Sequence, residues 1–208
     1  MKRKLNCIVL CLVTVLFIMG CGVRITDGMS PAETTEAFLQ CVKTQDEGNI
    51  GKIYEGKKND FLDLSSNDKI KKAMKEKWLD FDYKIGKESI SKDGETAKVK
   101  VDITTYDMAT VFNDYYLEYM ERALEEFSGK AATTMTDKAL DRMSSEILKE
   151  KVEKAKEKTF HAETALTLTR KGDRWIVNDV KDNAQFLNAI TGGMLSVMNE
   201  VADTMRSN

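Results

Sequence analysis

Two stretches of the sequence alternate apolar and polar side chains, and this pattern restricts the middle of the fold to an antiparallel sheet. A period of two with one apolar face is typical of hairpins that bury one side. The break in the pattern over 86–91 predicts a β-bulge. The residues of the first apolar face, on both sides of a turn at 92–95, are Leu79, Phe81, Tyr83, Ile85, Ala97, Val99, Val101 and Ile103. The second face, interrupted by a turn at 171–173, contains Phe160, Ala162, Thr164, Leu166, Leu168, Trp175 and Val177.

Helical periodicity accounts for most of the remaining chain. Ser30-Pro31-Ala32-Glu33 combines a capping box with a proline at the first helical position, which predicts a helix to about residue 46. The 3.6-residue period continues over 49–57, 67–78, a helical insertion at 108–157 and a last helix at 183–205, which Gly192-Gly193 interrupts. We therefore predict an α+β fold, in which N-terminal helices pack on a curved antiparallel sheet of two hairpins.

The N-terminus has the tripartite pattern of a secretory signal. Lys2, Arg3 and Lys4 precede an uncharged stretch, residues 5–19. The uncharged interval reaches residue 23, close to the roughly 20 residues that a spanning helix needs, so a plain membrane anchor is an alternative.

Ile18-Met19-Gly20-Cys21 resembles the bacterial lipobox, although Met19 departs from the usual small residue at its position. The resemblance implies cleavage between Gly20 and Cys21 and a diacylglyceryl lipid on Cys21. Two acyl chains anchor a protein stably, whereas one is marginal. We therefore predict a signal peptide at 1–20, a lipidated tether at 21–29 and a single domain at 30–205, held at the outer face of a bacterial cytoplasmic membrane.

Charge and cysteine content exclude several classes of function. Removal of 1–20 leaves 29 basic and 34 acidic side chains, a net charge of −5, which disfavours a nucleic-acid partner. Cys41 is the one cysteine beyond Cys21, so the domain has no pair for an internal disulfide. Its helical position predicts a buried thiol. No cysteine or histidine spacing suits a metal, and we expect neither metal nor cofactor.

The order of the elements and the closing stretch 172–179, Gly-Asp-Arg-Trp-Ile-Val-Asn-Asp, resemble the NTF2-like, cystatin-like α+β cone. In particular, they resemble small lipoproteins of Gram-positive bacteria that carry such domains and have no assigned function. The resemblance covers residues 30–182. The insertion at 108–157 and the long last helix depart from a minimal cone. Enzymes on this fold place acid–base groups inside the cone, so the resemblance directs attention to the inward faces of the strands.

Few residues are candidates for chemistry, and we predict no catalytic residue. His161 is the sole histidine, and the alternation places it outward, beside Glu163. Tyr83 is a polar-tipped inward residue, and an acid–base role would require a carboxylate or histidine bonded to it. Asp107 and Asp179 end strands, where they either line a cavity rim or begin turns.

Aromatic residues of the insertion form a second candidate. Phe112, Tyr115, Tyr116 and Tyr119 recur at helical spacing, a pattern that usually packs against a core or partner helix. Tyr115 and Tyr116 are adjacent, so one of them faces elsewhere. We predict Tyr83, Tyr115, Tyr116 and Tyr119 as pocket or groove residues.

These features favour a lipid-anchored extracytoplasmic module that binds a small apolar ligand or an envelope protein and has no catalytic activity. Two alternatives remain open at this stage. One is a small cone-fold enzyme of the isomerase or dehydratase type. The other is a cell-envelope scaffolding protein, with the insertion and last helix as its partner surface.

Overall fold

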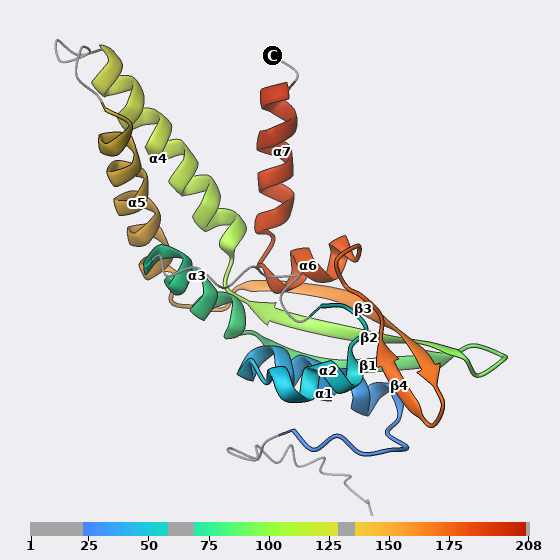
Figure 1. The fold of residues 1–208 in the computed structure, drawn as a ribbon. Coiled ribbons are helices and arrows are strands. Elements are labelled where there is room, and N and C mark those ends of the chain that lie inside the picture. Colours follow the sequence, from blue (N-terminus) through green and yellow to red (C-terminus); the bar gives the residue numbers. More distant parts are fainter. Residues whose placement is uncertain (1–22, 58–68, 129–135, 207–208) are drawn as a thin grey trace, which may run out of the picture.

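A computed structural model describes residues 23–57, 69–128 and 136–206 of the chain. Within these residues it contains seven helices and one four-stranded antiparallel sheet that does not close (Figure 1). The helices are α1 (Pro31–Thr44), α2 (Glu47–Ile53), α3 (Lys69–Leu79), α4 (Met108–Ser128), α5 (Asp137–Lys154), α6 (Ala184–Ile190) and α7 (Met194–Arg206). The strands are β1 (Asp82–Ile90), β2 (Thr96–Thr105), β3 (Phe160–Lys171) and β4 (Arg174–Val177).

The sheet has the order β1-β2-β3-β4, so the two predicted hairpins pair through β2 and β3 across the helical insertion. The β1–β2 register shifts between Ile85 and Glu88, which confirms the predicted bulge. Along β2, every second side chain from Ala97 to Thr105 is buried, whereas the alternate side chains are exposed or partly exposed. The predicted α+β fold with a one-faced sheet is confirmed.

Helices α1, α2 and α6 cover the buried face. The helix α1 begins with the predicted capping box, in which Ser30 accepts a hydrogen bond from the Glu33 backbone and the Glu33 carboxylate accepts one from Ser30. Phe38 of α1 and Phe186 of α6 are both fully buried, with ring centroids 6.2 Å apart. These two helices therefore share one core on one face of the sheet, and we call the sheet with α1, α2 and α6 the body.

The short helix α6 also protects an edge of the sheet. β4 pairs only with Leu168 to Lys171 of β3, which leaves the earlier carbonyl groups of β3 without a neighbouring strand. Asn183 caps α6 by accepting from the Phe186 N–H, and its Nδ2 donates to the Ala165 carbonyl at 2.9 Å. One side chain thus satisfies both a helix end and a sheet edge.

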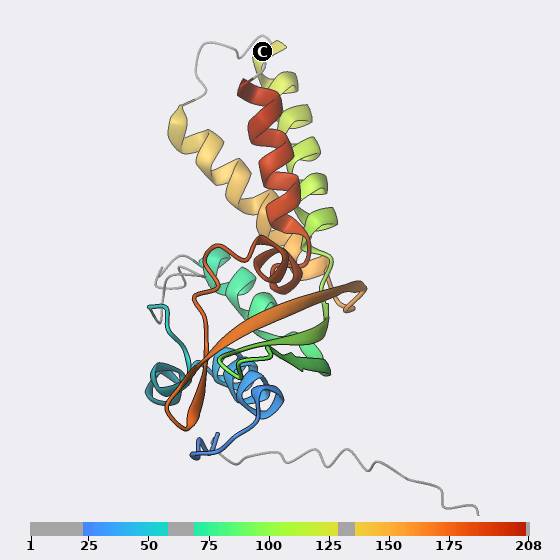
Figure 2. The ribbon, with the colours of Figure 1, turned by 90° about the vertical axis from the view of Figure 1, so that its right-hand side faces the viewer.

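Helices α4, α5 and α7 form a separate arm that rises from the body (Figures 1 and 2). A second hydrophobic core lies at the foot of this arm, where it meets α3. Its fully or largely buried members are Tyr106, Met108, Val111, Val152 and Met194. The predicted interruption of the last helix is confirmed, because Gly192 and Gly193 have φ of 61° and 80° and separate α6 from α7. No helix in the described ranges is long and apolar enough to span a membrane.

Three local expectations differ from the structure. The second helix covers 47–53 rather than 49–57, because Tyr54 leaves it to pair with Val177 of β4. Leu79 ends α3 instead of beginning a strand. Residues 23–29, predicted as part of a tether, contact the body, since Val23, Ile25 and Met29 pack against its core.

Candidate functional site

The arm is an addition to the sheet and helices that make up the body. Polar contacts between its helices fix the shape of the arm. Tyr115 of α4 shares a hydrogen bond with Ser144 of α5, with 2.8 Å between the two hydroxyl oxygens. Lys151 of α5 forms an ion pair of 2.6 Å with Glu118 of α4, and Arg122 also pairs with Glu118. The contacts of Tyr115 and Glu118 hold α4 against α5, whereas the pair between Arg122 and Glu118 lies within α4.

The predicted tyrosines do not gather at one site. Tyr115 and Tyr119 stack with ring centroids 6.1 Å apart, and Phe112 lies 5.8 Å from Tyr115. Tyr116 points the other way and lines a small groove between α4 and α7, together with Val197 and Val201. Tyr83 belongs to the core of the body, so the structure separates it from the three tyrosines of the arm.

The outward side of α4 carries large apolar side chains that the described residues leave partly exposed. Leu117 is 59% exposed, Met120 is 39% exposed and Leu124 is 62% exposed. Asp114, Glu121 and Glu125 lie along the same side of the helix, around the shallow groove that Leu117 also lines. We call this surface, formed by Asp114, Leu117, Met120, Glu121, Leu124 and Glu125, the α4 face.

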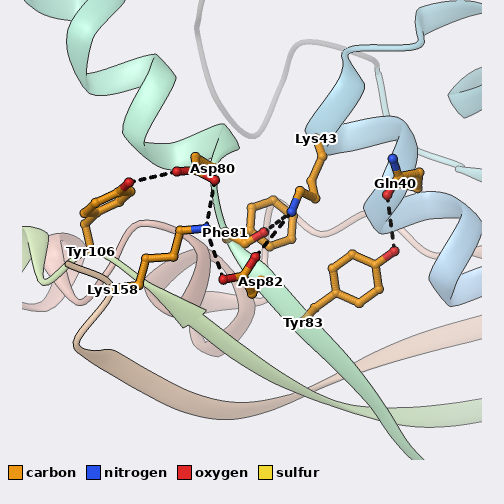
Figure 3. A network of polar contacts seen from close by, with 8 residues as sticks. All are labelled: Gln40, Lys43, Asp80, Phe81, Asp82, Tyr83, Tyr106 and Lys158. Atoms are coloured by element: carbon orange, nitrogen blue, oxygen red, sulfur yellow. Dashed lines mark hydrogen bonds and ion pairs between the residues drawn. The ribbon is translucent and has the colours of Figure 1, made fainter. Parts of the chain in front are cut away.

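A charged network joins the arm to the body, and we call it the base network (Figure 3). Asp80 lies between α3 and β1, Tyr106 between β2 and α4, and Lys158 between α5 and β3. Tyr106 Oη donates to Asp80 Oδ2 at 2.8 Å. Lys158 Nζ lies 2.8 Å from Asp80 Oδ1 and 3.0 Å from Asp82 Oδ2. The network therefore ties two places where the chain passes between arm and body, at Tyr106 and Lys158, to the junction of α3 and β1 at Asp80.

Electrostatics keep Asp80 and Lys158 of the base network charged and Tyr106 neutral. Burial opposes the charge of Asp80, yet hydrogen bonds from Lys158 and Tyr106 hold the pKa of its carboxyl below the usual value. Burial likewise opposes the charge of Lys158, but its bonds to Asp80 and Asp82 raise its pKa. The hydrogen bond to Asp80 and then burial raise the pKa of Tyr106. None of these shifts moves a group toward neutral pH, which is the direction that acid–base catalysis needs.

A lysine of α1 extends the network toward Tyr83 (Figure 3). Lys43 contacts the Phe81 carbonyl oxygen, lies 3.8 Å from Asp82 Oδ1 and faces the Tyr83 ring at 5.9 Å. Tyr83 Oη donates to Gln40 Oε1 at 3.4 Å, and burial raises the pKa of Tyr83 to about 12. Among the described residues, therefore, the partner of Tyr83 is an amide rather than the carboxylate or histidine that an acid–base role requires.

The other residues singled out in the sequence have structural contacts. His161 is exposed on the uncovered face of the sheet, as predicted, and its Nδ1 lies 2.9 Å from Thr104 Oγ1. Asp107 accepts from the Thr110 N–H at the start of α4, and Asp179 accepts from the Lys181 N–H. Cys41 is buried, and burial raises the pKa of its thiol to about 11, so it is unreactive at neutral pH.

Two predictions cannot be placed, and one feature was missed. Gly20 and Cys21 lie outside the described residues. In the part of the chain that is described, no group of three or more histidine, cysteine, aspartate or glutamate residues is arranged to hold a metal ion. The base network escaped sequence analysis because its members are far apart in the chain; the one available signal is that each lies near the end of an element.

Comparison with known proteins adds a fold relationship. No family model and no curated protein matches this chain. Among solved structures, it is similar to the crystal structure of a Bacillus subtilis protein described as a "putative lipoprotein (ycdA)". The TM-score is 0.51 at 15% sequence identity, and the match covers 76% of this chain and 55% of the other. This chain thus spans about half the length of that protein, and the likeness concerns the fold alone.

Proposed function

We propose that this chain is a lipoprotein, anchored through a diacylglyceryl group on Cys21 at the outer face of the cytoplasmic membrane. There it acts as an interaction module without catalytic activity, and the arm is the part presented to a partner. The signal-like N-terminus, the lipobox resemblance and the fold shared with a protein described as a lipoprotein support the anchor. The pKa shifts of Asp80, Lys158 and Tyr106 away from neutral pH and the amide partner of Tyr83 support a role without acid–base chemistry.

The observation that best supports the proposal is the way in which the first described residues are attached to the body. Asn49 Nδ2 donates to the Val23 carbonyl at 3.0 Å, and the Gly28 N–H donates to the Asp173 carbonyl at 3.3 Å. Since Cys21 precedes Val23 by two residues, a lipid on Cys21 lies within about 7 Å of chain from that attachment. Residues 23–29 lie at the opposite end of the molecule from the arm (Figures 1 and 2). An anchor at Cys21 therefore directs the arm away from the bilayer.

We also assign the body to the NTF2-like cones. The antiparallel sheet with α1 and α6 against one face supports this assignment, and the arm is an addition to such a cone. In this chain the space beneath the sheet holds large side chains, including Phe38, Phe81 and Phe186, each fully buried. That packing favours the arm over the interior of the cone as the place where a partner binds.

Metabolic labelling tests the anchor. Cells that express the full chain and receive labelled palmitate should incorporate the label into the protein, and the protein should fractionate with membranes. The Cys21→Ala variant should take up no label and leave the membrane fraction. Label that persists in Cys21→Ala would refute lipidation at this residue.

A further inference from the structure

The α4 face has the pattern of a surface that binds a helix. Leu117, Met120 and Leu124 are spaced by three and four residues, so they follow one line along two turns of α4. A single exposed leucine is ordinary on a protein surface, but three large apolar side chains in a line form a continuous stripe. A stripe at this spacing matches the apolar face of an amphipathic partner helix.

Acidic side chains border this stripe on one flank. Asp114, Glu121 and Glu125 are all exposed, and Glu121 and Glu125 form no ion pair within the described residues. Glu118 differs, because Lys151 and Arg122 already pair with it. The α4 face therefore presents apolar contact area beside carboxylates that are available to cations from another molecule.

The charges discriminate between the possible occupants. A bilayer surface rich in anionic lipids repels the carboxylates beside the stripe. A second copy docked with its α4 antiparallel on the same face brings two sets of these carboxylates together, and such like-charge contacts are costly. A helix with lysine or arginine flanking its apolar face meets neither obstacle.

We propose that the α4 face binds a basic amphipathic helical segment of a partner protein; this rests on the proposed function and names the chemistry of its partner. Leucine-like side chains of the segment pack against Leu117, Met120 and Leu124. Its cations reach Glu121 and Glu125. α4 has 21 residues and is about 31 Å long, so a segment of about 14 residues fits along it.

Binding of a synthetic peptide tests this inference. The probe is a fluorescent 14-residue peptide of leucine and lysine at amphipathic helical spacing, with one photoreactive side chain; the reference peptide has glutamate in place of lysine. The full chain is used as isolated from cells, in phosphatidylcholine nanodiscs if it is lipidated and in buffer if it is not. Docking is thus measured whichever result the palmitate experiment gives.

We expect the lysine peptide to bind and to cross-link within 114–125, and the glutamate peptide and empty nanodiscs to give no such signal. Leu117→Gln combined with Leu124→Gln should weaken binding at least about tenfold. Ile90→Gln is the matched control, because Ile90 is 51% exposed but lies on β1. Glu121→Gln with Glu125→Gln should weaken binding roughly threefold and reduce its dependence on salt, whereas Glu95→Gln with Glu157→Gln should do neither.

Three outcomes overturn the inference. The first is unchanged affinity in the Leu117/Leu124 variant. The second is peptide cross-links that map outside α4. The third is cross-linking between two copies of the chain through α4 in place of the peptide, which identifies the face as a self-association surface. An anchor that fails is recognised separately, since the palmitate label is then absent while peptide binding persists.

Discussion

Gly56 shows how closely single residues are fitted where α2 meets the sheet. Tyr54 Oη donates to Asp179 Oδ1 at 2.9 Å and accepts from the Val180 N–H at 3.2 Å. A Cβ added at Gly56 would overlap the Tyr54 hydroxyl and lie 2.8 Å from Asp179 Oδ1. We predict that Gly56→Ala lowers the free energy of unfolding by about 1–3 kcal/mol, as overpacking typically does. Denaturant titration measures the change.

Gly48 is the matched control for this substitution. It lies in the first turn of α2, and a Cβ there meets its nearest neighbour, Asp46 Oδ1, at an ordinary 3.5 Å. Gly48→Ala should therefore stabilise the protein, by a few tenths to about 1 kcal/mol, because alanine loses less backbone entropy in a helix. If both substitutions shift stability in the same direction, the close packing around Gly56 is not the cause.

A second prediction at the residue scale concerns Asp80, because the charge of its carboxyl is linked to folding. The pKa of its carboxyl is lower in the folded protein than its reference value of 3.8. The stabilisation is therefore fully present above the unfolded pKa and is lost as pH falls through the folded pKa. Asp80→Asn should cost about 1 kcal/mol near pH 7, a modest value because the side chain is 53% exposed.

The pH dependence distinguishes this interaction from a general loss of packing. The difference in unfolding free energy between the wild type and Asp80→Asn should shrink as pH falls below about 4, since the wild-type carboxyl then becomes protonated as well. Asp102→Asn, on the exposed face of β2, should stay within about 0.5 kcal/mol of wild type at every pH. A pH-independent difference for Asp80→Asn contradicts the linkage.

At the scale of elements, local patterns in the sequence predict what depends on near neighbours. The capping box at Ser30, the bulge after Ile85 and the break at Gly192-Gly193 were all predicted, because each is decided within a few residues. The boundary of α2 was not predicted, since Tyr54 pairs with Val177, far along the chain.

The candidate site depends more strongly on distant contacts. Helical periodicity predicted the tyrosine stripe of α4, but it does not reveal which side of α4 lacks a neighbour; that depends on where α5 and α7 pack. Leu117, Leu124 and Phe112 are all apolar residues of α4. Phe112 packs against the second hydrophobic core, whereas Leu117 and Leu124 are exposed. For the same reason, no local pattern unites Asp80, Tyr106 and Lys158.

Contacts within the arm are separate from those of the body, and this gives a prediction at the scale of elements. Glu118 accepts hydrogen bonds from Lys151 and Arg122, and these lower the pKa of its carboxyl. Glu118→Gln should speed amide hydrogen exchange in α4 and α5 roughly threefold while leaving β2 and β3 unchanged, because the arm packs on a separate core.

Glu121→Gln is the control, since Glu121 lies one turn from Glu118 and forms no ion pair within the described residues. It should leave exchange in α4 unchanged. Faster exchange in the sheet as well as the arm would show that the two cores unfold as one unit.

At the scale of the whole molecule, the two cores and the N-terminal attachment combine into a directional arrangement. The body fixes residues 23–29 at one end, and the base network fixes the arm at the other (Figures 1 and 3). Because Lys158 and Tyr106 bind the same carboxylate, the arm is held at its root by charge as well as by apolar packing. A rigid root is what a module needs if it is to present a binding face at a set distance from a membrane.

Together with the proposed anchor at Cys21, this arrangement predicts how the protein is oriented on a membrane. A fluorophore attached at Asp173→Cys, beside the N-terminal segment, should be quenched by bromine-labelled lipids, whereas one at Glu126→Cys on α4 should not. Cys41 should stay unlabelled, because it is buried and the pKa of its thiol is about 11. Quenching at Asp173→Cys should disappear when Cys21→Ala is added. Equal quenching at both positions would mean that the arm lies along the bilayer, where the α4 face is closed to a protein partner.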